Sequence, residues 1–93
     1  KLMTASDLRV TPHHFRDRDG REVDIVLERD DGMIAGIEVK ASATVKVGDF
    51  SGLRALADAC GDRFAFGTVL YDNTDVVPFG DRLAAVPLSS LWS

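Results

Sequence analysis

The sequence predicts a small α/β domain of the α+β kind, built on one mixed sheet with strands before and after a single helix. Three observations support this fold class. Residues 22–28 and 34–40 alternate apolar and polar side chains, as half-buried strands do. Residues 50–60 carry apolar side chains at helical spacing, and the apolar stretch 64–71 is typical of a buried strand.

Length and charge limit what the chain can be. Its 93 residues suffice for one domain, and we expect residues 1–93 to form one. Fifteen acidic side chains against eleven basic ones give a net charge of −4, which excludes a strongly basic protein that coats DNA. The single cysteine, Cys60, excludes an internal disulfide and a cysteine-based zinc site. No apolar run approaches the roughly 18 residues of a membrane span, so we expect a cytoplasmic protein without membrane contact.

A three-residue loop sets the register of the first predicted hairpin. Residues 30–32 read Asp-Asp-Gly, which is typical of a type I turn closed by a glycine in the left-handed conformation. Arg29 then pairs with Met33, and the numbers of paired residues add up to 62. Alternation predicts that one face of the hairpin carries the side chains of Val23, Ile25, Leu27, Ala35, Ile37 and Val39.

The same register brings four charged side chains together on the other face. Asp24 is predicted to lie opposite Glu38, and Glu22 opposite Lys40. Two carboxylates at a cross-strand Cβ distance of about 4.5–5.5 Å repel each other unless one is protonated or a cation lies between them. We therefore expect Asp24 and Glu38 to hold Mg²⁺ or Mn²⁺, with Lys40 beside the site. Gly36 on this face leaves room for a ligand or another backbone.

Two acids and a lysine on adjacent strands are the groups that metal-assisted phosphodiester hydrolysis needs. The metal polarises the phosphate and lowers the pKa of a bound water, while the ammonium stabilises negative charge. The alternative is an ordinary solvated face, on which Glu22 and Lys40 form a simple cross-strand ion pair.

Local signals predict the remaining elements. Residues 1–3 resemble the end of a helix, and 13–16 read as a short strand. Asp49 is the expected N-cap of the helix and Gly61 its C-cap, while Pro78 favours a strand at a sheet edge. The other expected elements are turns at 17–20 and 72–74, a hairpin of 76–79 with 83–86, and a helical turn at 88–92.

The motif residues carry a family resemblance. Asp24, followed by Glu38-Val39-Lys40, resembles the PD-(D/E)xK nuclease superfamily, which has the restriction-endonuclease-like fold. Over residues 13–92, the runs HFRDRDGREVDIVLE, GIEVKAS, DFSGLRALAD and VVPFGDRLAAVPLSSLW resemble a C-terminal domain of many prokaryotic AAA-type (P-loop) ATPases. That domain is of uncharacterised function and has the nuclease-like fold.

The resemblance implies roles for particular residues. Asp24 and Glu38 match the two metal-binding acids of the superfamily, the carbonyl group of Val39 matches a further ligand, and Lys40 matches the catalytic lysine. Val23 stands where the superfamily has a proline. An upstream helical glutamate has no counterpart here.

The resemblance also implies a context. No GxxxxGK[ST] phosphate loop occurs in the chain, so ATP would bind only in an ATPase part that precedes Lys1. We therefore expect the C-terminal fragment of a longer ATPase, possessing the nuclease-like sheet without its first helix. Asp7 is the sole acid before the turn at 17–20, and its context does not fit the missing glutamate.

Basic side chains flank the expected site. Arg16, Arg18, Arg21 and Lys46 are candidates for contacts with DNA phosphates, although alternation with Asp17 and Asp19 equally fits a solvated turn. His13 and His14 point to opposite faces of a strand, so they cannot share one site, and we expect surface or packing roles for them.

The expected activity is Mg²⁺- or Mn²⁺-dependent hydrolysis of DNA phosphodiesters. The first alternative is a catalytically silent module that binds DNA, a partner protein or the ATPase domain of the same chain. The second is a structural domain that forms homo-oligomers.

Overall fold

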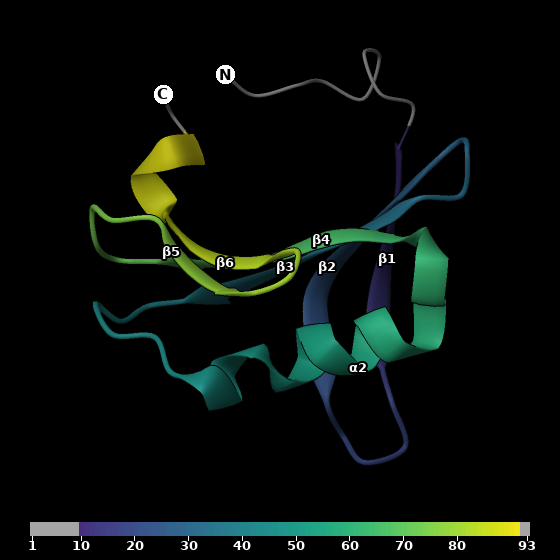
Figure 1. Ribbon diagram of the computed structural model, residues 1–93, viewed down its shortest axis with the longest axis horizontal. Coiled ribbons are helices and arrows are strands. Elements are labelled where there is room, and N and C mark those ends of the chain that lie inside the picture. The colour runs from purple at the N-terminus through teal and green to yellow at the C-terminus, as the bar shows by residue number, and fades with distance from the viewer. Residues whose placement is uncertain (1–9, 92–93) are drawn as a thin grey trace.

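Six strands form one mixed sheet in the order β1-β2-β3-β4-β6-β5 (Figure 1). The computed structural model describes the backbone of residues 10–91 and the side chains of residues 13–89, so the predictions for residues 1–3, Asp7 and Trp92 lie outside it. The strands are β1 (Val10–Arg16), β2 (Glu22–Arg29), β3 (Ile34–Lys40), β4 (Phe64–Tyr71), β5 (Val77–Gly80) and β6 (Leu83–Pro87). The helical segments are η1 (Val47–Phe50), α2 (Ser51–Cys60), η2 (Gly61–Arg63) and η3 (Leu88–Leu91).

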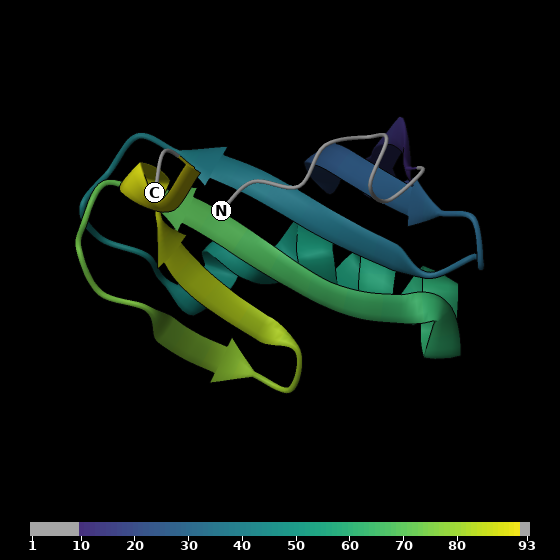
Figure 2. The same ribbon diagram turned by 90° about the horizontal axis from the view of Figure 1, so that it is seen from above.

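The order of the elements confirms a mixed sheet with one α-helix among the described residues. Strands β1, β2 and β3 form an antiparallel meander, and α2 then leads to β4, which runs parallel to β3. Strand β6 is parallel to β4, and β5 pairs antiparallel with β6 at the edge of the sheet (Figure 2). Pro78 lies in this edge strand, as predicted, because proline has no backbone N–H to donate and is tolerated where one side of a strand has no partner.

Helix α2 packs against one face of the sheet and forms the core with it. Leu53 and Leu56 are buried together with Val26 of β2 and Val69 of β4. A Cβ atom built on Gly36 would lie 2.6 Å from a Leu53 methyl and 2.9 Å from a Leu56 methyl. The space beside Gly36 is therefore filled by the helix, and the expectation of room for a ligand there is wrong.

The predicted hairpin register is confirmed along its paired part. Ile25 pairs with Ile37 and Glu28 with Ile34, and the N–H of Arg29 donates to the carbonyl oxygen of Met33 at 2.9 Å. Gly32 has the left-handed φ of 88° that the turn requires.

Strand β2 contains an irregularity that alternation did not predict. His13 pairs with Val26 and Phe15 with Val23, so two residues of β2, Asp24 and Ile25, lie opposite His14 alone. This is the geometry of a β-bulge, which rotates the strand locally. Val23 is consequently fully buried against α2 while Ile25 is 40% exposed, so the prediction that these two share a face is wrong.

The ends of the local elements agree only in part with expectation. Gly61 is the C-cap of α2, with φ 57°, as predicted. Asp49 is not its N-cap: it lies inside η1, its carboxylate accepts the N–H of Lys46 at 2.7 Å, and the N-cap of α2 is Phe50. The first strand begins at Val10, earlier than the predicted residue 13, and the final helical turn is the 3₁₀ segment η3.

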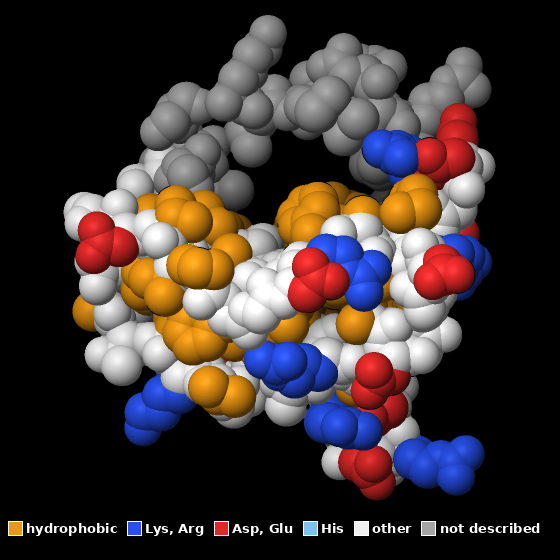
Figure 3. Space-filling view, viewed as in Figure 1, with side chains coloured by type: hydrophobic (Ala, Val, Ile, Leu, Met, Phe, Trp, Pro, Cys, Tyr) orange, Lys and Arg blue, Asp and Glu red, His pale blue; other side chains and the backbone are white. Residues whose placement is uncertain are grey.

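The sheet face opposite α2 is apolar and exposed among the described residues. Val39 and Phe66 are 49% and 50% exposed, and two shallow hollows adjoin Phe66. Hydrophobic side chains gather along this side of the molecule in Figure 3. These hollows are not lined by Asp24, Glu38 or Lys40.

Candidate functional site

Asp24 and Glu38 are interlocked where the β2–β3 ladder ends. The last paired residues are Ile25 and Ile37, and beyond them side chains replace the ladder bonds. The N–H of Asp24 donates to Glu38 Oε1 at 2.7 Å, and the N–H of Val39 donates to Asp24 Oδ2 at 3.0 Å. Each carboxylate is thus tied to the backbone of the other strand, so the structure brings the predicted pair together.

The surroundings of the Glu38 carboxylate disfavour its negative charge. Partial burial raises the pKa of Glu38, and the negative charges of Asp24 and Glu22 raise it further. The hydrogen bond from the N–H of Asp24 and the charge of His14 act in the opposite direction. The Glu38 carboxylate is therefore partly removed from solvent and lies close to other carboxylates, which is a condition that a bound cation relieves.

The raised pKa of Glu38 predicts a pH-dependent effect of Glu38→Gln. A carboxyl group whose pKa is higher in the folded chain than its ordinary 4.5 favours folding below 4.5 and loses that contribution as pH rises through the folded-state pKa. Glutamine keeps the Oε1 acceptor and removes the charge. We expect Glu38→Gln to be more stable relative to wild type at pH 7 than at pH 4, measured by urea unfolding at both pH values. The opposite trend would contradict this electrostatic account.

The oxygen atoms that remain suit a hard divalent cation. Asp24 Oδ1 and Glu38 Oε2 receive no hydrogen bond from a described residue. Carboxylate oxygens are the ligands that Mg²⁺ prefers, and Mg²⁺ usually keeps several waters. Within residues 10–91, no three His, Cys, Asp or Glu side chains form a metal-binding group. Two carboxylates with backbone, water or substrate oxygens are the donor set that this chain offers, and the carbonyl group of Val39 stays a predicted ligand.

Lys40 does not pair with Glu22. Its Nζ lies 2.5 Å from Asp49 Oδ2, and both side chains are about 30% exposed. This hydrogen bond, followed by that from the Lys46 N–H, lowers the pKa of Asp49, so the carboxylate stays ionised. Glu22 instead pairs across the β1–β2 ladder with Arg16 at 3.6 Å, and both of these side chains are largely exposed, so the expected Glu22–Lys40 pair is not formed.

The other candidate basic residues lie mostly at the β1–β2 turn. Arg21 is tied to Asp17 at 2.7 Å and to Asp19 at 3.4 Å, which agrees with the solvated-turn interpretation. Arg18 lies in the same exposed turn. Charged side chains of both signs surround this turn at the lower right of Figure 3. The Lys46 side chain is exposed at the start of η1, away from this turn in the sequence.

Sequence reasoning missed two contributors to the site: His14 and Asp49. His14 lies opposite the bulge, and its charge acts on Glu38, whereas the exposed His13 ring contacts Glu28 at 3.0 Å. The three-residue spacing of Val23 and Val26, both buried, is the signal that could have revealed the bulge. Nothing in the local pattern signalled the contact between Lys40 and Asp49.

Among the described residues, no helix has the length and apolar character needed to cross a membrane. No curated protein and no solved structure matches the chain. One family model does match, and its description is Domain of unknown function (DUF4143). The match extends over residues 1–91, and it therefore includes every element and site residue described above. The chain belongs to this family of domains of unknown function, DUF4143.

Proposed function

We propose that this domain is a nuclease-like module that hydrolyses DNA phosphodiesters with the help of Mg²⁺ or Mn²⁺. The observation that carries the proposal is the interlocked pair of Asp24 and Glu38, which concentrates negative charge at the end of a ladder. The order of β1, β2, β3, α2 and β4 supports a restriction-endonuclease-like fold, because it supplies a meander, a helix and a parallel strand. The attachment to an AAA-type ATPase that binds ATP is part of the same proposal.

In this proposal the residues of the chain have three roles: they hold the cation, stabilise negative charge on the phosphate and contact the DNA backbone. When bound, a divalent cation polarises the scissile phosphate and lowers the pKa of a water. Asp24 and Glu38 hold the cation, and Lys40, two residues beyond Glu38 on the same strand face, stabilises negative charge on the phosphate. Arg16, Arg18, Arg21 and Lys46 are the proposed phosphate contacts along the DNA.

Asp24→Asn tests this function. Asparagine keeps an acceptor for the N–H of Val39 but removes one metal-binding charge. We expect the variant to bind Mn²⁺ at least about tenfold more weakly in calorimetry, since even residues around a metal site change affinity by that much. Metal-dependent cutting of single- and double-stranded DNA should fall by about 10² or more.

The matched control is Asp58→Asn, which removes an exposed carboxylate from α2. It should leave Mn²⁺ binding and DNA cleavage unchanged. If wild-type protein binds no Mn²⁺ and cuts no DNA form, the nuclease proposal is wrong.

A catalytically silent module that binds DNA, a protein or the ATPase domain is the second candidate. The observation that favours it is the ion pair of Lys40 with Asp49, because an ammonium that already has a carboxylate partner is less available to a phosphate. Mn²⁺ binding without cleavage by the wild-type protein would support this second function. A homo-oligomeric structural domain would instead show a sedimentation coefficient that rises with concentration.

A further inference from the structure

The Lys40 side chain is held in place by a residue that is itself anchored. Asp49 Oδ2 accepts from Lys40 Nζ at 2.5 Å and from the N–H of Lys46 at 2.7 Å. The second bond fixes the carboxylate against the backbone of η1, the turn that leads into α2. Asp49 is therefore a fixed point, and the long lysine chain is the flexible partner that it orders.

This arrangement differs from an ordinary surface ion pair. Exposed pairs usually contribute little, because ordering two long side chains costs conformational entropy. Here one partner is a short aspartate already ordered by its turn, and both side chains are largely shielded from solvent. Arg29 and Asp31 form the contrasting case, because they pair at 2.5 Å with about half of each side chain exposed.

The Lys40–Asp49 ion pair lies at the end of the strand that carries Glu38. Lys40 ends β3, and Glu38 precedes it by two residues on the same face. Without Asp49, the long lysine side chain would adopt many conformations, and its ammonium group would occupy many positions around the end of β3. With Asp49, its reach is confined to the space between the end of β3 and the start of the helical region.

We propose that Asp49 is a positioning residue that holds the Lys40 ammonium at the end of β3, on the strand face that also carries Glu38. This inference rests on the proposed function, since it assigns Asp49 a part in the same reaction. Asp49 acts only through Lys40 and touches neither metal nor phosphate. Loss of such orientation is costly, because a displacement of about 1 Å can reduce a rate by as much as 10².

The test is a kinetic double-mutant cycle in the full chain. Asp49→Asn keeps an oxygen that can accept the N–H of Lys46 but removes the charge that holds Lys40. We expect it to lower the metal-dependent cleavage rate about tenfold in the wild-type background and less than about twofold in the Lys40→Ala background. Equal losses in the two backgrounds would show a merely structural role and overturn the proposal.

The matched control is Asp31→Asn, which removes an equally short ion pair far from the site in the sequence. It should leave the cleavage rate unchanged. If it lowers the rate as much as Asp49→Asn does, loss of any surface pair is enough and the assignment to Asp49 is wrong.

A second measurement does not depend on cleavage. The chain has three lysines, so the ε-methylene signals in an NMR relaxation experiment can be assigned with a Lys40→Ala variant. Asp49→Asn should make the ε-methylene group of Lys40 as mobile as that of Lys46, whereas Asp31→Asn should not. If wild-type protein cuts no DNA, the proposed function fails and this result alone decides whether Asp49 orders Lys40. An unchanged order of the Lys40 methylene in Asp49→Asn would overturn the proposal even if the enzyme cleaves.

Discussion

Replacing Gly52 with alanine is expected to destabilise the fold by about 2 kcal/mol or more. A Cβ at this position would lie 2.0 Å from the carbonyl oxygen of Glu22 and 2.9 Å from its carbonyl carbon. Both are backbone atoms of β2, which cannot rotate away as a side chain can. Helix α2 must therefore move off the sheet, and the resulting loss exceeds the roughly 1 kcal/mol that alanine gains over glycine in helix propensity.

Gly48→Ala is the matched control for this substitution. Gly48 lies in η1, four residues before Gly52, and a Cβ placed on it would meet no atom within 4 Å apart from its chain neighbours. The free energy of unfolding of Gly48→Ala in urea should differ from that of wild type by no more than about 0.5 kcal/mol. Equal stability of Gly52→Ala and Gly48→Ala would mean that α2 does not pack this closely on β2.

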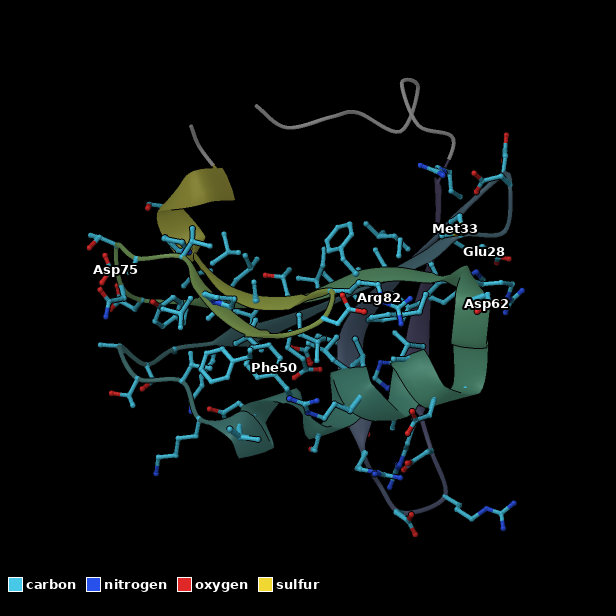
Figure 4. All side chains as sticks on the ribbon, viewed as in Figure 1. Glu28, Met33, Phe50, Asp62, Asp75 and Arg82 are labelled. Atoms are coloured by element: carbon cyan, nitrogen blue, oxygen red, sulfur yellow. The ribbon has the colours of Figure 1, made fainter. Side chains whose placement is uncertain are left out.

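Phe50→Ala is expected to cost about 3–5 kcal/mol, which is a large share of the stability of a small domain. The Phe50 ring is fully buried and stacks on the ring of Phe79, with centroids 4.6 Å apart. Figure 4 shows Phe50 between the η1–α2 segment and the strands above it. Truncation leaves a cavity that the surrounding strands and helix cannot fill by collapsing, and the stacking contact is lost as well.

Phe66→Ala provides the comparison within the same chain. Phe66 is half-exposed on the sheet face opposite α2, so its truncation removes much less buried area. Urea unfolding followed by circular dichroism should rank wild type, Phe66→Ala and Phe50→Ala in decreasing order of stability. A reversed order of the two variants would show that the core lies on the other face of the sheet.

The residues changed in these two substitutions also support the candidate site through the fold. Glu22, whose carbonyl oxygen lies against Gly52, precedes Asp24 by two residues on β2. Phe50 directly follows Asp49 in η1. The close packing of α2 on the sheet therefore holds both the acidic pair and the partner of Lys40 in their places.

Turn, cap and strand signals in the sequence predict most of the local elements and the register of the β2–β3 hairpin. Asp30, Asp31 and Gly32 specify a turn, and that turn, with its glycine at positive φ, dictates which residues pair. The pairing in turn places Asp24 and Glu38 at the same level of two neighbouring strands. Gly61 and Pro78 likewise act through their own backbone restrictions, so their positions could be predicted.

The assembly of the candidate site depends instead on contacts between segments that are distant in the sequence. The bulge at Asp24 and Ile25 depends on the pairing of β2 with β1, and it turns Val23 toward the helix against the alternation of the sequence. The contact of Lys40 with Asp49 depends on how η1 and α2 pack against β3. Alternation and turn chemistry act over a few neighbouring residues, whereas a bulge and a side-chain partner are selected by packing between segments that are distant in the chain.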